Sequence, residues 1–121
     1  VLDDHSPRYA KLKPYQYTGS IYAVQPPSER ATLGADQWQT MTVRCEGSKV
    51  QVRVNGKQTV DADLNDYPEK FESNPGLKRR SGFIGLQNHS PGNVQFRNVM
   101  IRDLSNKDAC VKSVSSCGTR S

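Results

Sequence analysis

The chain has 121 residues, of which 34% are hydrophobic and 24% charged, and its formal net charge is +5. This length suits one domain with a modest core. No run of eighteen apolar residues is present, so we expect no membrane span. The basic residues are scattered apart from residues 77–80, and no nucleic-acid-binding motif is recognisable. We therefore expect no nucleic-acid partner.

The amino-terminal third differs from the rest of the chain in composition and in its lack of clean periodicity. It begins with an apolar pair followed at once by Asp3 and Asp4, without the basic-then-apolar order of a signal peptide. This start is typical of the end of a strand, so we expect a fragment or a processed chain. The following residues are rich in tyrosine and proline, and only residues 19–24 are predicted to form a strand.

Residues 38–64 carry the clearest pattern in the sequence. Apolar and polar residues alternate through 38–46 and again through 50–54, which predicts half-buried strands. Asn55-Gly56 is a strong hairpin signal, because a two-residue type I′ turn needs positive φ at both central positions. With a second short turn at 46–48, the pattern predicts a three-stranded antiparallel meander.

The rest of the chain alternates loops with strand-like segments. Residues 65–80 hold two prolines and many charges, which predicts a long surface loop. Strands are predicted at 82–88 and at 94–103. Alternation changes phase near Asn98, which predicts a bulge.

Residues 105–121 form a polar, cysteine-containing tail that we interpret as a linker, a terminal extension or a mobile end. Cys110 and Cys117 could form a disulfide in an oxidising compartment, which would leave Cys45 as a small buried hydrophobe. A zinc site is disfavoured, because His5 and His89 show no paired spacing with the cysteines.

Six elements taken in order resemble the carboxy-terminal half of the 3-keto-disaccharide hydrolase family, a branch of the concanavalin A-like lectin/glucanase sandwiches. They are Leu2-Asp3-Asp4, the stretch YTGSIY at 17–22, Trp38, Asn55-Gly56, the stretch GFIGLQNH at 82–89, and Phe96-Arg97-Asn98. The resemblance covers about residues 1–104. It implies an all-β fold, an antiparallel β-sandwich or jelly roll, of which this chain is about half.

The resemblance also implies that the amino-terminal half of the domain is missing from this chain. Family members carry roughly as much sequence again before the Leu-Asp strand end, and a lone half would leave sheet edges open. Either the missing half-domain was removed from this chain, or another protein chain completes the sandwich. The tail at 105–121 lies beyond the family pattern.

The activity implied by the resemblance is cleavage of a glycoside whose sugar is oxidised to a ketone at carbon 3, in the periplasm or outside the cell. A ketone acidifies the adjacent C–H, so a base can remove that proton, the glycosidic oxygen can leave by elimination, and water then adds back. This chemistry needs a general base, a stabiliser of the enolate oxygen, and an acid or a divalent metal that polarises the ketone.

His89 and Asp3 are the predicted catalytic residues. An imidazole titrates near neutrality, and His89 ends a predicted strand, although a surface histidine in a turn fits the same pattern. Gln87 shares its strand face with His89 by parity, and Leu86 points the other way. Asp3 could ligate a metal, or it could belong to a solvated turn.

The predicted substrate-binding residues are those that could hydrogen-bond or stack on a sugar: Gln87, Arg80, Tyr17, Tyr22 and Asp4. For each of them a solvent-facing role is the competing interpretation. Three functions stay open: a 3-keto-glycoside hydrolase if the amino-terminal half is supplied, a non-catalytic carbohydrate-binding module, and a structural protein completed by another chain.

Overall fold

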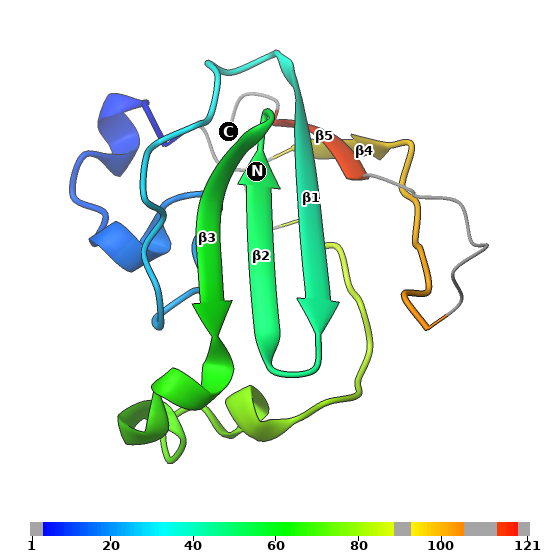
Figure 1. Ribbon diagram of the computed structural model, residues 1–121. Coiled ribbons are helices and arrows are strands. Elements are labelled where there is room, and N and C mark those ends of the chain that lie inside the picture. The colour runs from blue at the N-terminus through cyan, green and yellow to red at the C-terminus, as the bar shows by residue number, and fades with distance from the viewer. Residues whose placement is uncertain (1–3, 89–92, 106–113, 119–121) are drawn as a thin grey trace.

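The computed structural model describes residues 4–88 and 93–105 and the backbone of residues 114–118. Its strands form one antiparallel five-stranded sheet in the order β3-β2-β1-β5-β4 (Figure 1). The strands are β1 Trp38–Glu46, β2 Lys49–Val54, β3 Lys57–Asp63, β4 Val94–Arg97 and β5 Val114–Gly118. This arrangement confirms the predicted all-β class.

Helical structure in the described residues is limited to short 3-10 turns. These are η1 Pro7–Tyr9, η2 Pro14–Gln16, η3 Leu64–Asp66, η4 Pro68–Lys70 and η5 Pro75–Lys78. Four of the five contain proline in the first turn, where its missing N–H leaves no hydrogen bond unmade. A helix long and apolar enough to cross a membrane is absent from this part of the chain.

The meander predicted over 38–64 is present as β1, β2 and β3. Its first turn contains Gly47 with φ of 60°, and its second contains Asn55 and Gly56 with φ of 51° and 82°. Both central residues of the second turn are thus left-handed, as a type I′ hairpin requires. The prediction from the Asn-Gly pair is confirmed.

A β-bulge at Thr59 is a feature that the sequence pattern did not predict. The register between β2 and β3 shifts after Val52, which pairs with Val60, whereas Arg53 pairs with Gln58, so Thr59 is the extra residue. The Thr59 side chain is buried, and its hydroxyl donates a hydrogen bond to the Gly19 carbonyl at 2.9 Å. The bulge therefore fastens the amino-terminal segment to the sheet.

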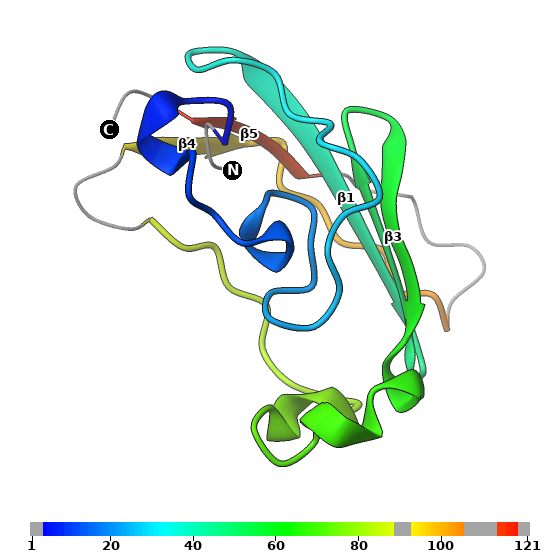
Figure 2. The same ribbon diagram turned by 90° about the vertical axis from the view of Figure 1, so that its left-hand side faces the viewer.

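One face of the meander is apolar and holds the core. Val52, Val54 and Val60 are buried there together with Ala31 from the amino-terminal segment. Figure 2 shows this segment, in blue to cyan, lying against the face of the sheet that is turned away from the viewer in Figure 1. We call residues 4–33 the cover.

The cover is tied to the hairpin end of the meander by a small network of amides. The Asn55 side chain donates to the Ala31 carbonyl at 2.8 Å and to Gln39 Oε1 at 3.1 Å. The same Gln39 oxygen accepts the Leu33 N–H at 2.8 Å. Gln39 is buried at a position where strand alternation would place an apolar residue, and these bonds offset the cost of its burial.

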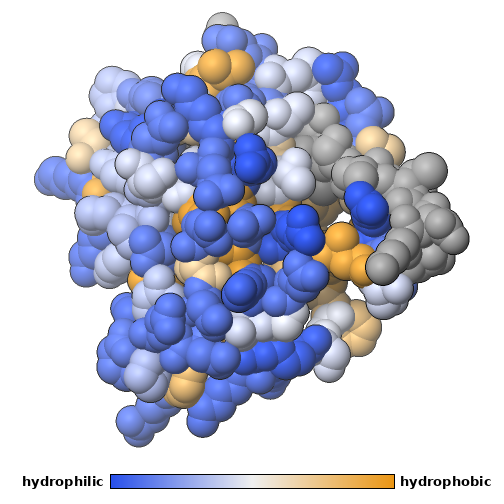
Figure 3. All heavy atoms as spheres, in the orientation of Figure 1, coloured by the Kyte–Doolittle hydropathy of each residue, from blue (hydrophilic) through white to orange (hydrophobic). Residues whose placement is uncertain are grey.

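The opposite face of the meander is polar. Arg44, Gln51 and Asp61 stand side by side on neighbouring strands, and Gln51 donates to Asp61 at 3.3 Å. Figure 3 shows mainly hydrophilic residues on this face. The described chain thus forms a sheet with one apolar and one polar face, as alternation predicts.

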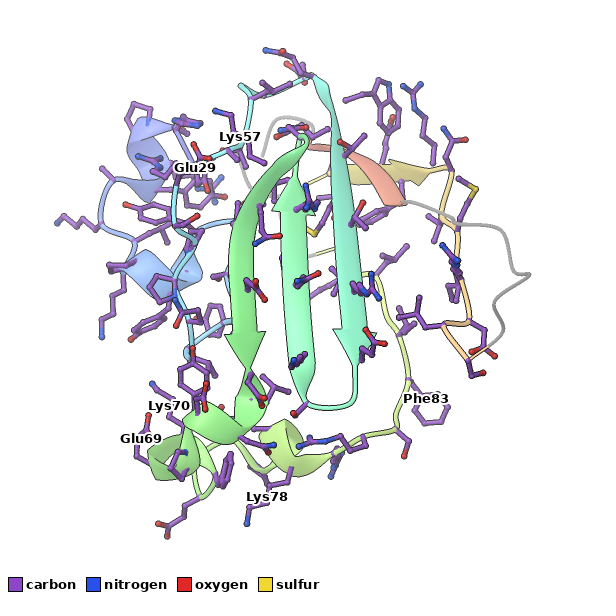
Figure 4. All side chains as sticks on the ribbon, viewed as in Figure 1. Glu29, Lys57, Glu69, Lys70, Lys78 and Phe83 are labelled. Atoms are coloured by element: carbon purple, nitrogen blue, oxygen red, sulfur yellow. The ribbon has the colours of Figure 1, made fainter. Side chains whose placement is uncertain are left out.

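The predicted strand at 82–88 is wrong for this structure. The segment forms no β-pairing with any described residue, and its apolar side chains are exposed, including Phe83 at 107% and Ile84 at 78%. Figure 4 shows Phe83 pointing away from the rest of the chain. A strand needs a neighbour for its backbone groups, and the described residues supply none here.

Two other predicted strands are shortened or absent. The predicted strand at 94–103 is regular only as β4, and Asn98, with φ of 53°, ends it in place of the predicted bulge. Residues 19–24 form a tight turn, because Gly19 and Ala23 have φ of 90° and 61°. Positive φ bends the chain out of an extended course.

The predicted tail also contains regular structure. β5 lies within it and pairs with β1 on one side and with β4 on the other. An interpretation of residues 105–121 as a simple extension is therefore wrong for 114–118, while the domain boundary at 104 stays a prediction. Cys45 is exposed, contrary to prediction, because the cover does not reach its end of β1. The predicted disulfide involves side chains outside the described part.

Candidate functional site

Asp4 is the centre of the most concentrated group of polar side chains in the described residues. It is 2% exposed, and its Oδ2 accepts the Thr18 N–H at 3.0 Å, while its Oδ1 accepts the Thr32 hydroxyl. A buried carboxylate is costly unless such donors satisfy it. Thr18 and Thr32 are themselves buried, so the carboxylate is held by donors from two distant parts of the cover.

Two cationic or ionisable side chains border this carboxylate. Arg30 donates to the Asp4 backbone carbonyl and lies 3.9 Å from Oδ1, and its guanidinium stacks over the Tyr17 ring at 4.5 Å from the centroid. His5 Nε2 lies 2.9 Å from the Thr32 carbonyl oxygen and 3.9 Å from Asp4 Oδ1. We call Asp4, His5, Tyr17, Arg30 and the two threonines the Asp4 cluster.

The Asp4 cluster combines a buried anion with a half-exposed basic and aromatic rim. The side chains of His5 and Arg30 are 43% and 40% exposed, so both reach solvent while remaining next to the buried carboxylate. Chemically, the imidazole can exchange a proton, the guanidinium can bind an oxyanion, and the Tyr17 ring can stack on a sugar face. These are the groups that a polar, ring-shaped ligand would meet at this surface.

Some predicted site residues meet at the Asp4 cluster, and others do not. Asp4 and Tyr17 belong to it. Tyr22 does not: it is 66% exposed, stands edge-on to Tyr15 at 6.3 Å, and accepts a hydrogen bond from Gln16 at 3.2 Å. The two tyrosines form a separate aromatic surface on the cover.

Arg80 lies at the other end of the meander. Its guanidinium donates to the Leu77 carbonyl and to Asn65 Oδ1, both at 2.9 Å, so it joins η5 to η3. In Figure 2, η3 and η5 lie below the lower end of the sheet, whereas η1, in dark blue, lies beside its upper part. Gln87 is exposed in the unpaired segment 82–88. Asp3 and His89 lie outside the described residues, so their catalytic roles stay predictions.

His5, Arg30 and Thr32 were not predicted as part of a site. Arg30 and Thr32 stand 26 and 28 positions after Asp4, in a segment without periodicity. Their meeting with Asp4 depends on how the cover folds back on itself, and no spacing rule encodes that path. Asp4 next to His5 was the only local signal.

The chemistry implied by the resemblance needs an acid or a divalent metal to polarise the ketone, and the cofactor was left open. The described residues contain no group of three or more histidine, cysteine, aspartate or glutamate side chains placed to hold one. Asp4 and His5 give two donors, and both Asp4 oxygens already accept hydrogen bonds. Within the described part of the chain, this donor set falls short of a metal site.

Tyr67 and Lys70 hold residues 23–25 of the cover. The Tyr67 hydroxyl donates to Gln25 Oε1 at 2.5 Å, and Lys70 Nζ donates to the Ala23 carbonyl at 2.8 Å. Burial, together with the nearby carboxylates of Asp66 and Glu69, raises the pKa of Tyr67 above its ordinary value of 10.0. The phenol therefore stays a hydrogen-bond donor through the neutral range.

The comparisons with known proteins agree with this fold. Among solved structures, a Parabacteroides distasonis protein assigned as a glycosyl hydrolase matches with a TM-score of 0.54 and 26% identity. The match covers 56% of this chain and 35% of that protein, so the chain corresponds to about a third of its length. The chain is therefore a partial β-sandwich of the glycosyl-hydrolase-like class.

The sequence profile of the 3-keto-alpha-glucoside-1,2-lyase-like domain matches residues 1–102. Because the match spans most of the chain, the chain belongs to this family. No curated protein matches the sequence. Membership confirms the resemblance drawn from residues 1–104.

Proposed function

We propose that this chain is part of a domain that cleaves 3-keto-glycosides in the periplasm or outside the cell. A base removes the proton from C2, next to the ketone, and the electrons of that C–H bond form the enolate. The enolate then expels the aglycone oxygen from C1, which leaves with a proton. Water adds across the resulting double bond and restores the C2 hydrogen. The observation that carries the proposal is the family match over residues 1–102.

In this proposal, His89 and Asp3 act as base and acid, and Asp4 fixes the chain next to Asp3. The Asp4 carboxylate is buried and occupied by Thr18 and Thr32, which suits a residue that fixes its neighbours in place. Asp3 precedes it directly in the chain. Asp4 thus contributes by holding the start of the cover in one conformation.

The exposed rim of the Asp4 cluster is the proposed contact surface for the sugar. Arg30 can donate to the enolate or hydroxyl oxygens, and Tyr17 can pack against the C–H face of the ring. Gln87 and Arg80 stay proposed substrate-binding residues. Both are far from the cluster in sequence, and their joining it requires the polypeptide that completes the sandwich.

The test is incubation of the longest natural form of the protein containing this chain with a 3-keto-disaccharide in D2O. We expect release of a 3-keto-monosaccharide carrying deuterium at C2, because proton abstraction and return both occur there. The matched control is the same disaccharide without the ketone, which lacks an acidified C–H and should remain intact. Release from both substrates at one rate, or product without deuterium, would count against the proposal.

Substitutions then locate the catalytic groups. His89→Gln and Asp3→Asn should each lower the rate by about 100-fold or more, which is the usual contribution of a general acid or base. Asp61→Asn is the matched control, since Asp61 lies exposed on the polar face. A substitution at His89 that leaves the rate unchanged would remove it from the mechanism.

A second candidate is carbohydrate binding without cleavage. The exposed Tyr15–Tyr22 pair favours it, because such aromatic surfaces stack on sugars whether or not a reaction follows. This function would give binding of the unoxidised disaccharide that weakens on Tyr22→Ala, without turnover of the keto form.

A further inference from the structure

The cover presents an excess of positive charge to solvent. Four of its residues are exposed and carry a full positive charge: Arg8, Lys11, Lys13 and Arg30. The cover has two acidic residues, Asp4 and Glu29. Asp4 is buried, and Glu29 Oε2 lies 3.4 Å from Lys57 Nζ, at the hairpin end of the meander (Figure 4). The exposed cations of the cover therefore set the charge that an approaching ligand meets.

The cover also holds four of the five tyrosines of the chain: Tyr9, Tyr15, Tyr17 and Tyr22. Three of these rings have a cation over them. The distances to the ring centroid are 5.7 Å for Arg8 over Tyr9, 6.0 Å for Lys13 over Tyr15 and 4.5 Å for Arg30 over Tyr17. Each of these rings therefore lies next to a positive charge. We call the four cations and the four tyrosines of the cover the basic tyrosine surface.

Tyr22 supplies the open ring of the basic tyrosine surface. It is 66% exposed and stands edge-on to Tyr15, with 6.3 Å between the ring centroids. Its hydroxyl accepts a hydrogen bond from the Gln16 side chain at 3.2 Å, and Lys13 Nζ lies over the Tyr15 ring. An open aromatic ring, an amide and an ammonium group thus belong to one connected group of side chains.

This combination of groups matches one kind of carbohydrate. A sugar ring packs its C–H face against an aromatic side chain, and its hydroxyls form hydrogen bonds with amides. A neutral sugar has no group that pairs with an ammonium or guanidinium ion. A sugar that carries a carboxylate or a sulfate does, because a charge-assisted hydrogen bond forms between the two ions.

We propose that the basic tyrosine surface binds an acidic glycan, a carbohydrate whose rings carry carboxylate or sulfate groups. Tyr22 stacks on one sugar ring, and Lys13 and Arg30 pair with the anionic groups of neighbouring units. Tyr15 and Tyr17 are two residues apart in the chain, so their Cα atoms lie within about 7 Å and a ligand of several sugar units reaches both. The proposal names the ligand class of the proposed function, and it rests on that function in taking the ligand to be a carbohydrate.

A single-stranded nucleic acid is the competing ligand, because it also combines rings with negative charge. Proteins that bind it present several open aromatic faces on which successive bases stack. Of the four tyrosines of the cover, only Tyr22 is exposed, and the other three are half-buried with a cation over the ring. This arrangement favours an acidic glycan.

Calorimetric titration with matched oligosaccharides tests the ligand class. The longest natural form of the protein containing this chain is titrated with oligogalacturonate, with a sulfated dextran oligomer and with the unmodified dextran oligomer. At least one of the two charged probes should bind with a dissociation constant at least about tenfold below that of the neutral one. The charged probe that binds more tightly identifies the anionic group as carboxylate or sulfate. Equal binding of all probes, or no binding of either charged one, would overturn the proposal.

A pair of double variants separates this surface from the net charge of the protein. Lys11→Gln with Lys13→Gln removes two charges from the cover and should raise the dissociation constant for the tighter charged probe about tenfold. Lys49→Gln with Arg53→Gln is the matched control, because both side chains are exposed on the polar face of β2. It removes the same charge and should change the constant less than about twofold. Equal weakening by the two double variants would show attraction by net charge alone and would reject the site.

Salt dependence separates the contribution of the ring from that of the cations. Tyr22→Ala should weaken binding of the tighter charged probe and leave its dependence on NaCl concentration unchanged, because the substitution removes a ring and no charge. The double variant at Lys11 and Lys13 should reduce that dependence. A salt dependence that is the same in the double variant and in the unaltered protein would contradict the proposal.

A final titration compares glycan with nucleic acid. Single-stranded oligothymidylate should bind more weakly than the tighter charged oligosaccharide at the same salt concentration. Tighter binding of the oligothymidylate would assign the surface to nucleic acid and overturn the proposal. None of these probes carries a ketone, so cleavage of a keto-sugar does not enter the measurements. Failure of the proposed function and failure of acidic-glycan binding are thus separate outcomes.

Discussion

Val54 and Val43 lie on the same face of the same sheet, yet Val54 is fully buried and Val43 is 55% exposed. The difference is the cover, which packs over β2 and β3 and leaves the far end of β1 open (Figure 2). Alternation along a strand therefore marks which residues can form a core. These residues become a buried core only where a second layer of the chain packs over them.

The largest loss of stability is expected from a substitution at Gly19, where the cover contacts the sheet at Thr59. A Cβ there would lie 2.6 Å from Thr59 Oγ1, and the φ of 90° strains any other residue. Gly19→Ala should lower the free energy of unfolding by about 3 kcal/mol. Urea denaturation measures it, with Gly76→Ala as the control, since open space surrounds Gly76. Equal effects at both glycines would mean that the cover does not press on the bulge.

The two valines test the comparison directly. Val54→Ala should cost about 2 kcal/mol of unfolding free energy, because it empties a packed site. Val43→Ala should cost less than about 0.5 kcal/mol, because the Val43 side chain is already 55% exposed. A cost at Val43 as large as the cost at Val54 would show that this part of the face is covered.

A smaller loss of stability is expected when the hydrogen bond from Tyr67 to Gln25 of the cover is removed. Because the folded pKa of Tyr67 is raised, the stability that this residue contributes is fully present below pH 10.0 and is lost as the pH rises through the folded pKa. Tyr67→Phe should lose about 1 kcal/mol at neutral pH and most of this alkaline dependence. Thermal unfolding between about pH 9 and about pH 11 measures both. An unchanged alkaline profile in Tyr67→Phe would assign the dependence to another group.

The sequence predicted some residues of the candidate site and missed others. Asp4 and Tyr17 were predicted and lie together, because both sit on the cover near Gly19 and the hairpin end of the meander. Arg30 and Thr32 could not be predicted, since their contacts with Asp4 span 26 and 28 residues of irregular chain. Arg80 was predicted to bind substrate, which stays a prediction, and its guanidinium joins two short turns by donating to the Leu77 carbonyl and to Asn65 Oδ1.

The sequence by itself determined the meander, its turns and the family. The Asn-Gly pair acts through local sterics, and three consecutive alternating segments joined by short turns supply one another with a pairing edge. The tertiary structure decided which strand-like segments become strands. GFIGLQNH has the composition of a strand, but pairing depends on a neighbouring edge, and its residues 82–88 form no β-pairing with the described residues. A strand forms only where two segments pair, so the sequence of one segment alone does not decide whether that segment becomes a strand.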